Sequence, residues 1–142
     1  MNISGNTILI TGGGTGIGRA LAEALHARGN QVIITGRRET PLAEAAAANP
    51  GMAYAVLDVA DAAAVRAFAA QVVKDHPGLN VVINNAGVML SEDLKAEPFD
   101  LEAVETTITT NLLAPIRLSA ALLPHLRAQA ASTIVTVTSG LA

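Results

Sequence analysis

The sequence predicts an α/β protein whose doubly wound parallel sheet has helices on both faces. Before residue 90, short apolar runs rich in β-branched residues alternate with segments of helical spacing, a pattern typical of crossover connections between parallel strands. Each run ends in glycine or polar residues, where ligands bind in such sheets. The length of 142 residues and a hydrophobic content of 51% indicate one domain, residues 1–142.

The first strand is expected at Thr7–Thr11, and it leads directly into glycines 12, 13, 14, 16 and 18. Apolar residues at helical spacing from Ile17 to Leu25 predict a helix that begins inside the glycine stretch. Glycines let backbone amides approach a phosphate, and a helix N-terminus adds partial positive charge. The turn therefore predicts a phosphate-bearing ligand, with a ligand-free glycine turn as the alternative. No Lys-Ser/Thr follows, so it is not a P-loop.

A second strand is expected at Gln31–Thr35, followed by Gly36, Arg37 and Arg38. In a dinucleotide-binding sheet, an acidic residue at the position of Gly36 would bind the adenosine ribose hydroxyls. A guanidinium instead binds a 2′-phosphate. The two arginines therefore predict NADP, with NAD less favoured; the alternative is that they only cap the strand in solvent.

The next elements repeat this arrangement. A helix over 39–48 leads to a strand at 53–57 that ends at Asp58-Val59, and Asp61 is the expected N-cap of the following helix. A fourth strand at 80–83 runs into Asn84-Asn85-Ala86-Gly87. Because the carboxyl ends of parallel strands share one edge, all these strand-end segments are expected to lie together.

Residues 88–100 are expected to form a loop, followed by helices at 101–110 and 112–128, with Pro115 in the first turn of the second. That helix has two apolar stripes, and one suffices for packing on the sheet. The other predicts either a subunit interface or a covering segment of the same chain. The stripes are Leu112, Ile116, Ala120 and Leu123, and Leu118, Leu122 and Leu126. A fifth strand is expected at 133–138, followed by Ser139.

Composition narrows the function. The net charge of −3 without a basic run argues against a nucleic-acid partner. The chain has no cysteine, and its three histidines are isolated, so no metal site is expected. Neither a secretory leader nor an apolar stretch of membrane-spanning length is recognisable, and a cytoplasmic location without membrane contact is expected.

Taken together, Thr11–Gly18, Asn84–Gly87, Asn111 and Ser139 make the chain resemble the short-chain dehydrogenase/reductase family, classical type. The segments Val32–Arg38 and Asn111–Leu118 resemble its DltE-type members in particular. The resemblance implies a Rossmann-type sheet of order 3-2-1-4-5, truncated here after the fifth strand. It also implies an oxidoreductase that transfers hydride between a nicotinamide and a small carbonyl or alcohol substrate.

The resemblance also implies residue roles. Gly12, Gly16 and Gly18 would hold the pyrophosphate, with Thr11 supporting the turn. Asp58 and Val59 would lie at the adenine, and Asn85, Ala86 and Gly87 at the nicotinamide ribose. Asn111 would bend its helix around an ordered water of a proton relay, and Ser139 would hydrogen-bond the substrate. The expected cofactor-binding set also includes Gly14, Thr15, Ile17, Arg37 and Arg38.

One family motif does not occur in these residues. A Tyr-x-x-x-Lys pair should follow the serine, but the sequence given ends three residues after Ser139, and its one tyrosine, Tyr54, opens the third strand. We therefore expect these 142 residues to bind NADP with little or no turnover. We also expect a homo-oligomer, formed through helix 112–128 or the exposed sheet edge. The alternatives are a non-catalytic NADP-binding sensor or scaffold module and, less favoured by the glycine spacing, a nucleotide-sugar epimerase.

Overall fold

The computed structural model describes residues 2–90, 93, 95, 98 and 101–139. Five parallel strands form one sheet in the order β3-β2-β1-β4-β5, which confirms the predicted topology. The strands are β1 (Thr7–Thr11), β2 (Gln31–Gly36), β3 (Ala53–Val56), β4 (Leu79–Asn84) and β5 (Thr133–Thr136). The bounds of β1 are those expected, and the ends of the other strands differ from the expected ones by no more than two residues.

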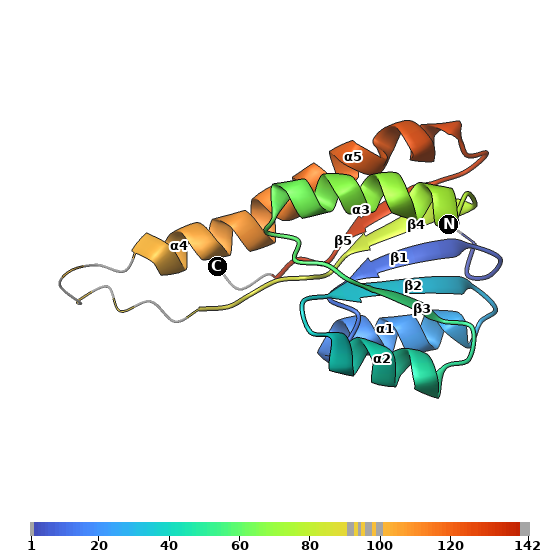
Figure 1. Ribbon diagram of the computed structural model, residues 1–142, viewed down its shortest axis with the longest axis horizontal. Helices are drawn as coiled ribbons and strands as arrows, with labels where there is room; N and C mark the ends of the chain where they lie inside the picture. The colour runs from blue at the N-terminus through green and yellow to red at the C-terminus, as the bar shows by residue number, and fades with distance from the viewer. Residues whose placement is uncertain (1, 91–92, 94, 96–97, 99–100, 140–142) are drawn as a thin grey trace.

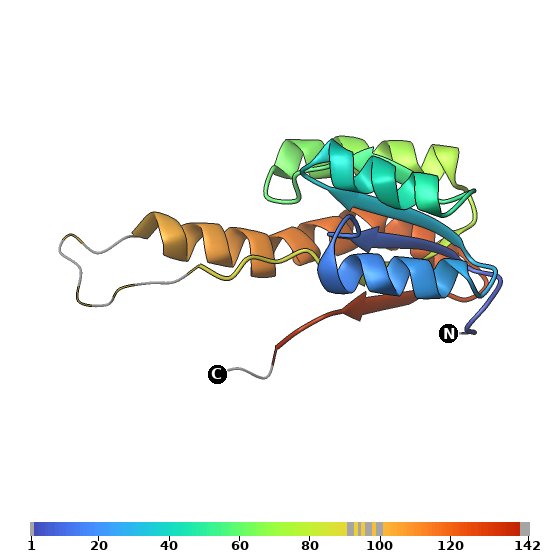
Figure 2. The same cartoon turned by 90° about the horizontal axis from the view of Figure 1, so that it is seen from below.

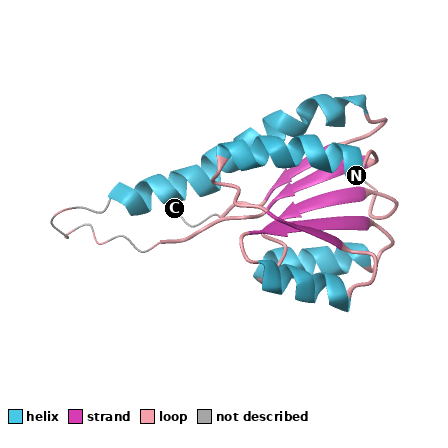
Figure 3. Ribbon diagram, viewed as in Figure 1, coloured by secondary structure: helices cyan, strands magenta, loops and turns pink. Residues whose placement is uncertain are grey.

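Helices cover both faces of the sheet (Figures 1 and 3). The helices are α1 (Gly16–His26), α2 (Glu39–Ala48), α3 (Ala62–Asp75), α4 (Leu101–Ile108) and α5 (Ala114–Ala128). The first two pack on one face, and α3 and α5 pack on the other. Alternation along each strand supplies both cores: Ile8 and Ile10 face α1 and α2, whereas Leu9 faces α3 and α5.

The segment 101–128 differs from the two separate helices that the sequence predicted. A π-helical turn, η1 (Thr109–Leu113), joins α4 to α5 in one helical run that extends well beyond the sheet (Figure 2). In this turn the Ala114 N–H donates to the Thr109 carbonyl, and Pro115 has no N–H to continue the usual ladder. Pro115 thus lies at the π-to-α junction. The loop expected at 88–100 lies mostly outside the described residues.

The two apolar stripes predicted for residues 112–128, which the structure divides between η1 and α5, have different environments. Leu118, Leu122 and Leu126 are fully buried against α3 and the sheet. On the other stripe, Leu112, Ile116 and Leu123 are 44–55% exposed. Within the described residues, the exposed stripe is therefore the face that lacks cover.

At the amino ends of the strands, side-chain amides connect neighbouring elements. The Asn30 amide nitrogen donates to the carbonyls of Ile3 and Leu25, while its oxygen accepts from the backbone and side-chain nitrogens of Asn6. Asn80 donates to the Asn6 side-chain oxygen at 3.1 Å and accepts from the Thr7 N–H at 3.0 Å. This asparagine network ties together the amino ends of β1, β2 and β4.

Candidate functional site

A cavity of about 340 Å³ opens at the carboxyl ends of the strands. Segments from five places in the sequence line it: the turn between β1 and α1, the start of α2, the loop after β3, the segment after β4 and the π turn. The lining residues are Gly12, Gly14, Thr15, Ile17, Gly18, Gly36, Arg37, Arg38, Pro41, Leu42, Leu57, Asp58, Val59, Asn85, Ala86, Gly87, Val88 and Thr110.

The turn after β1 requires glycine for steric reasons, most clearly where its backbone meets the end of β4 and the first turn of α1. Gly12 has φ +68°, and a Cβ there would lie 3.0 Å from the Ala86 Cα and 3.1 Å from the Asn85 side-chain nitrogen. A Cβ on Gly18 would collide with the Gly12 carbonyl oxygen. The chain therefore packs its backbone against the end of β4 and keeps this part of the cavity wall free of side chains.

The N-terminus of α1 is open to an anion. Its N-cap residue, Thr15, makes no side-chain cap hydrogen bond, and no acidic residue lies in the first turn. The free amides and the helix dipole both favour a negative group there.

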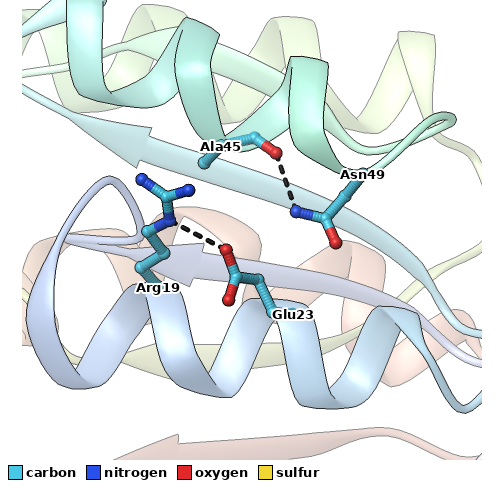
Figure 4. A network of polar contacts seen from close by, with 4 residues as sticks. All are labelled: Arg19, Glu23, Ala45 and Asn49. Carbon is cyan, nitrogen blue, oxygen red and sulfur yellow. Dashed lines mark hydrogen bonds and ion pairs between the residues drawn. The ribbon is translucent and has the colours of Figure 1, made fainter.

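Arg19, in the same helix, is engaged elsewhere. Its Nε donates to Glu23 at 2.8 Å, beside the Asn49–Ala45 bond that closes α2 (Figure 4). This hydrogen bond to Arg19 lowers the pKa of Glu23 below its usual value. The arginines that line the cavity are instead Arg37 and Arg38.

Arg37 and Arg38 lie directly after β2 and are exposed. Gly36 precedes them, and a Cβ on Gly36 would meet the nearest atom of Leu42 at 3.6 Å, an ordinary contact. A Cβ on Gly14 would come within 3.3 Å of the same leucine. Leu42 therefore packs between the glycine turn and Gly36 and forms part of the cavity wall at this end.

Side-chain hydrogen bonds hold the segment after β4. The Thr11 hydroxyl accepts from the N–H groups of Asn85 and Ala86, each at 3.0 Å, and the Asn85 amide donates to the Thr11 carbonyl at 3.0 Å. From the π turn, Asn111 accepts from the Val88 N–H at 2.8 Å and donates to the Val88 carbonyl at 2.7 Å. The chain on the far side of the cavity is thus fixed from both β1 and the helical run.

Most of the residues predicted from the sequence come together here. Of the expected cofactor-binding set, twelve residues line the cavity; Thr11 supports the wall through Asn85 and Ala86, and Gly16 begins α1 at φ +55°. Asn111 acts on the wall through Val88. Ser139 lies beyond β5 and is exposed, and it is not among the lining residues.

Apart from Gly36, whose position was compared above with that of the acidic residue, five lining residues lie outside the expected set: Pro41, Leu42, Leu57, Val88 and Thr110. Leu57 could have been found as the last apolar residue of the β3 run. The others carry no local signal of a binding role.

Acidic side chains near the site have structural partners. Asp58 accepts from the Ala60 N–H at 3.0 Å, and Asp61 caps α3. The N–H groups of Ala64 and Ala63 hold the pKa of Asp61 below its usual value. Within residues 2–90, 93, 95, 98 and 101–139, no group of three or more His, Cys, Asp or Glu side chains could hold a metal. No helix in this part of the chain has the length and apolar character needed to cross a bilayer.

The sheet order and the helices on both faces define an α/β domain with the Rossmann fold. The family model described as short chain dehydrogenase matches residues 6–142. The chain therefore belongs to the short-chain dehydrogenase family, whose members are oxidoreductases that use nicotinamide cofactors.

Individual relatives agree with this assignment. The chain is 44% identical to the uncharacterized oxidoreductase DltE of Bacillus subtilis, over 100% of this chain and 56% of that protein. It is 34% identical to dehydrogenase/reductase SDR family member 13 of Bos taurus, over 97% of this chain and 37% of that protein. The chain thus spans about half the length of the curated relatives that it matches, or less.

Solved structures show the same fold. A short-chain dehydrogenase from Streptomyces avermitilis superposes with a TM-score of 0.84 at 32% identity, covering 94% of this chain and 49% of that one. A protein of Shigella flexneri, described as a short chain dehydrogenase complexed with NADP, has a TM-score of 0.86 at 27% identity, covering 96% and 59%.

Proposed function

We propose that this chain is the cofactor-binding part of an NADP-dependent oxidoreductase acting on a small carbonyl or alcohol substrate. The observation that carries the proposal is the convergence of an uncapped helix N-terminus and two arginines on one 340 Å³ cavity. An anion site and a cationic edge on the same cavity fit a pyrophosphate and a 2′-phosphate of one ligand.

The residues present fit such a cofactor. Because Gly12 and Gly18 carry no Cβ, the turn packs closely against the end of β4, and the cavity beside the amides of α1 would accept a pyrophosphate. Arg37 and Arg38 would bind the 2′-phosphate, Asp58 and Val59 would border the adenine, and Asn85, Ala86 and Gly87 would border the nicotinamide ribose. When bound, the nicotinamide donates or accepts a hydride. The protein fixes its orientation through the Thr11–Asn85 and Asn111–Val88 hydrogen bonds.

We propose that residues 1–142 bind this cofactor with little or no turnover by themselves. Carbonyl reduction needs a group that transfers a proton to or from oxygen, with its pKa tuned by a neighbour. Tyr54 lies in β3, at the edge of the sheet, and does not line the cavity. Ser139 would hydrogen-bond the substrate oxygen, and Asn111 would order the water of a proton relay.

Titration of the folded 142-residue protein with NADPH tests the proposal. Saturable binding, with no carbonyl-dependent oxidation of NADPH, is the expected result. A folded protein that forms no saturable complex would contradict cofactor binding, and measurable carbonyl reduction would contradict the lack of turnover.

A non-catalytic NADP-binding sensor or scaffold is the second candidate, because it would need the same glycine turn from Gly12 to Gly18. The two hydrogen bonds between Asn111 and Val88 favour the oxidoreductase. A module that only binds NADP would not need a π turn to hold the segment that would border the nicotinamide ribose. The coding sequence after position 142 separates them: a Tyr-x-x-x-Lys pair soon after Ala142 supports the enzyme.

We also propose self-association in the cytoplasm. The exposed stripe formed by Leu112, Ile116 and Leu123 continues along α4 with Leu101 and Ile108, which are 64% and 48% exposed. Within the described chain, β5 also has one edge that pairs with no strand. Either surface can bury apolar area or satisfy backbone groups in a second copy. Sedimentation at tens of micromolar tests this, and a stable monomer would contradict it.

A further inference from the structure

A second, much smaller cavity lies directly behind the wall of the cofactor-sized cavity. Val59, Ala86 and Thr110 line both spaces, and the smaller one is completed by Thr11, Asn84, Ala114, Pro115 and Leu118. The centre of a water molecule can occupy about 10 Å³ of it. That is close to the room, ~10–15 Å³, that a single buried water requires.

The π turn deprives the backbone carbonyl of Thr110, a residue that lines this cavity, of its usual donor. The Thr110 carbonyl would accept from residue 114 in an α-helix and from residue 115 in a π-helix. The Ala114 N–H donates to the Thr109 carbonyl instead, and residue 115 is a proline, which has no N–H. Thr110 is half-buried, and a carbonyl shielded from bulk water is costly without a partner, so a donor from outside the helix is favoured.

The strand ends offer the complementary groups. Both lone pairs of the Thr11 hydroxyl accept backbone N–H groups, so its own hydrogen remains to be donated, and this residue is 2% exposed. Asn84, 5% exposed, donates its amide to the Ser119 hydroxyl at 3.2 Å. Its amide oxygen has no hydrogen bond among the described residues. Three residues that line the cavity, Thr11, Asn84 and Thr110, therefore offer one donor and two acceptors between them.

We infer that one ordered water molecule is bound in this cavity as a structural ligand. It accepts from the Thr11 hydroxyl and donates to the Thr110 carbonyl and the Asn84 amide oxygen, so three of its hydrogen bonds are satisfied. The water joins the ends of β1 and β4 to the π turn. It thereby fixes Ala86 and Thr110, which form part of the cofactor-cavity wall, and it is bound whether or not a cofactor is present.

A crystal structure of the cofactor-free protein, at a resolution that places ordered waters, tests the inference. We expect one water within hydrogen-bond distance of both the Thr110 carbonyl oxygen and Thr11 Oγ1. An empty cavity, or a protein donor bonded directly to the Thr110 carbonyl, would overturn the inference. This readout does not depend on cofactor binding, so it can fail or succeed separately from the proposed function.

Two variants of α5 extend the test. Ala114→Val places two methyl groups against the cavity, whereas Ala120→Val adds the same volume on the exposed side of the helix. In solution, a long-lived buried water gives magnetisation transfer to the Ala86 amide. We expect that signal in the parent protein and in Ala120→Val, and its loss in Ala114→Val. Its absence from the folded parent protein, or its persistence in Ala114→Val, would contradict the inference. If Ala114→Val does not fold, the parent and Ala120→Val spectra decide.

Discussion

Replacing Arg37 with alanine separates a cofactor-specific role from a passive cap on β2. If Arg37 binds the 2′-phosphate of NADP, the variant loses a charge-assisted hydrogen bond, worth about 1.5–3 kcal/mol. Arg37 is exposed, so solvent screening favours the lower limit. A loss of about 1.5 kcal/mol raises the Kd for NADPH roughly tenfold. NADH has no 2′-phosphate, so its Kd should change less than about twofold.

Calorimetric titration of both cofactors measures this difference. Arg28→Ala is the matched control, because Arg28 donates to the Ala24 carbonyl at the far end of α1 and does not line the cavity. Gly36→Asp provides the reverse test: the position has room for a Cβ, and a carboxylate there should repel the 2′-phosphate and favour NADH. Equal losses of NADPH and NADH affinity in Arg37→Ala would refute the assignment of Arg37 to the phosphate.

Three further predictions follow from the geometry. Gly12→Ala should abolish NADPH binding, because alanine disfavours φ +68° and its Cβ would lie 3.0 Å from the Ala86 Cα, so that the turn has to move. An unchanged affinity in titration would show that the turn does not bind the pyrophosphate. Leu122→Ala should lower the free energy of unfolding, measured in urea, by about 2–5 kcal/mol because Leu122 is fully buried. Leu123→Ala, on the exposed stripe, should lower it by less than about 0.5 kcal/mol and should weaken self-association in sedimentation. Similar losses of stability in both variants would contradict the burial pattern. Asp61→Ala should lower the melting temperature at pH 7, and the difference from the parent should shrink in acid. Because folding lowers the pKa of Asp61, its carboxylate stabilises the fold at any pH above the ordinary pKa of 3.8, and this stabilisation is lost as the pH falls through the folded-state pKa. A difference in melting temperature that is independent of pH would exclude the charged cap.

The sequence was most informative where local pattern and tertiary role coincide. Buried parallel strands require continuous β-branched runs, so β1 and β2 were located almost to the residue, and Asp61 was recognised as a cap because capping is a local interaction. The π turn was not predicted, because a proline at position 115 is equally compatible with the first turn of a new helix. Leu42 was missed because a core leucine and a cavity-wall leucine have the same local pattern.

At the end of the sheet opposite the cavity, the asparagine network requires one side-chain amide both to donate and to accept hydrogen bonds. Asn30 must offer two hydrogens to carbonyl oxygens and, at the same time, an oxygen to two nitrogens of Asn6. An aspartate has a nearly identical shape but only accepts, so spontaneous deamidation at this one position would set a negative oxygen against the carbonyls of Ile3 and Leu25. Deamidation of this one side chain would thus weaken the hydrogen bonds that join the amino ends of β1, β2 and β4, at the end of the sheet away from the cavity.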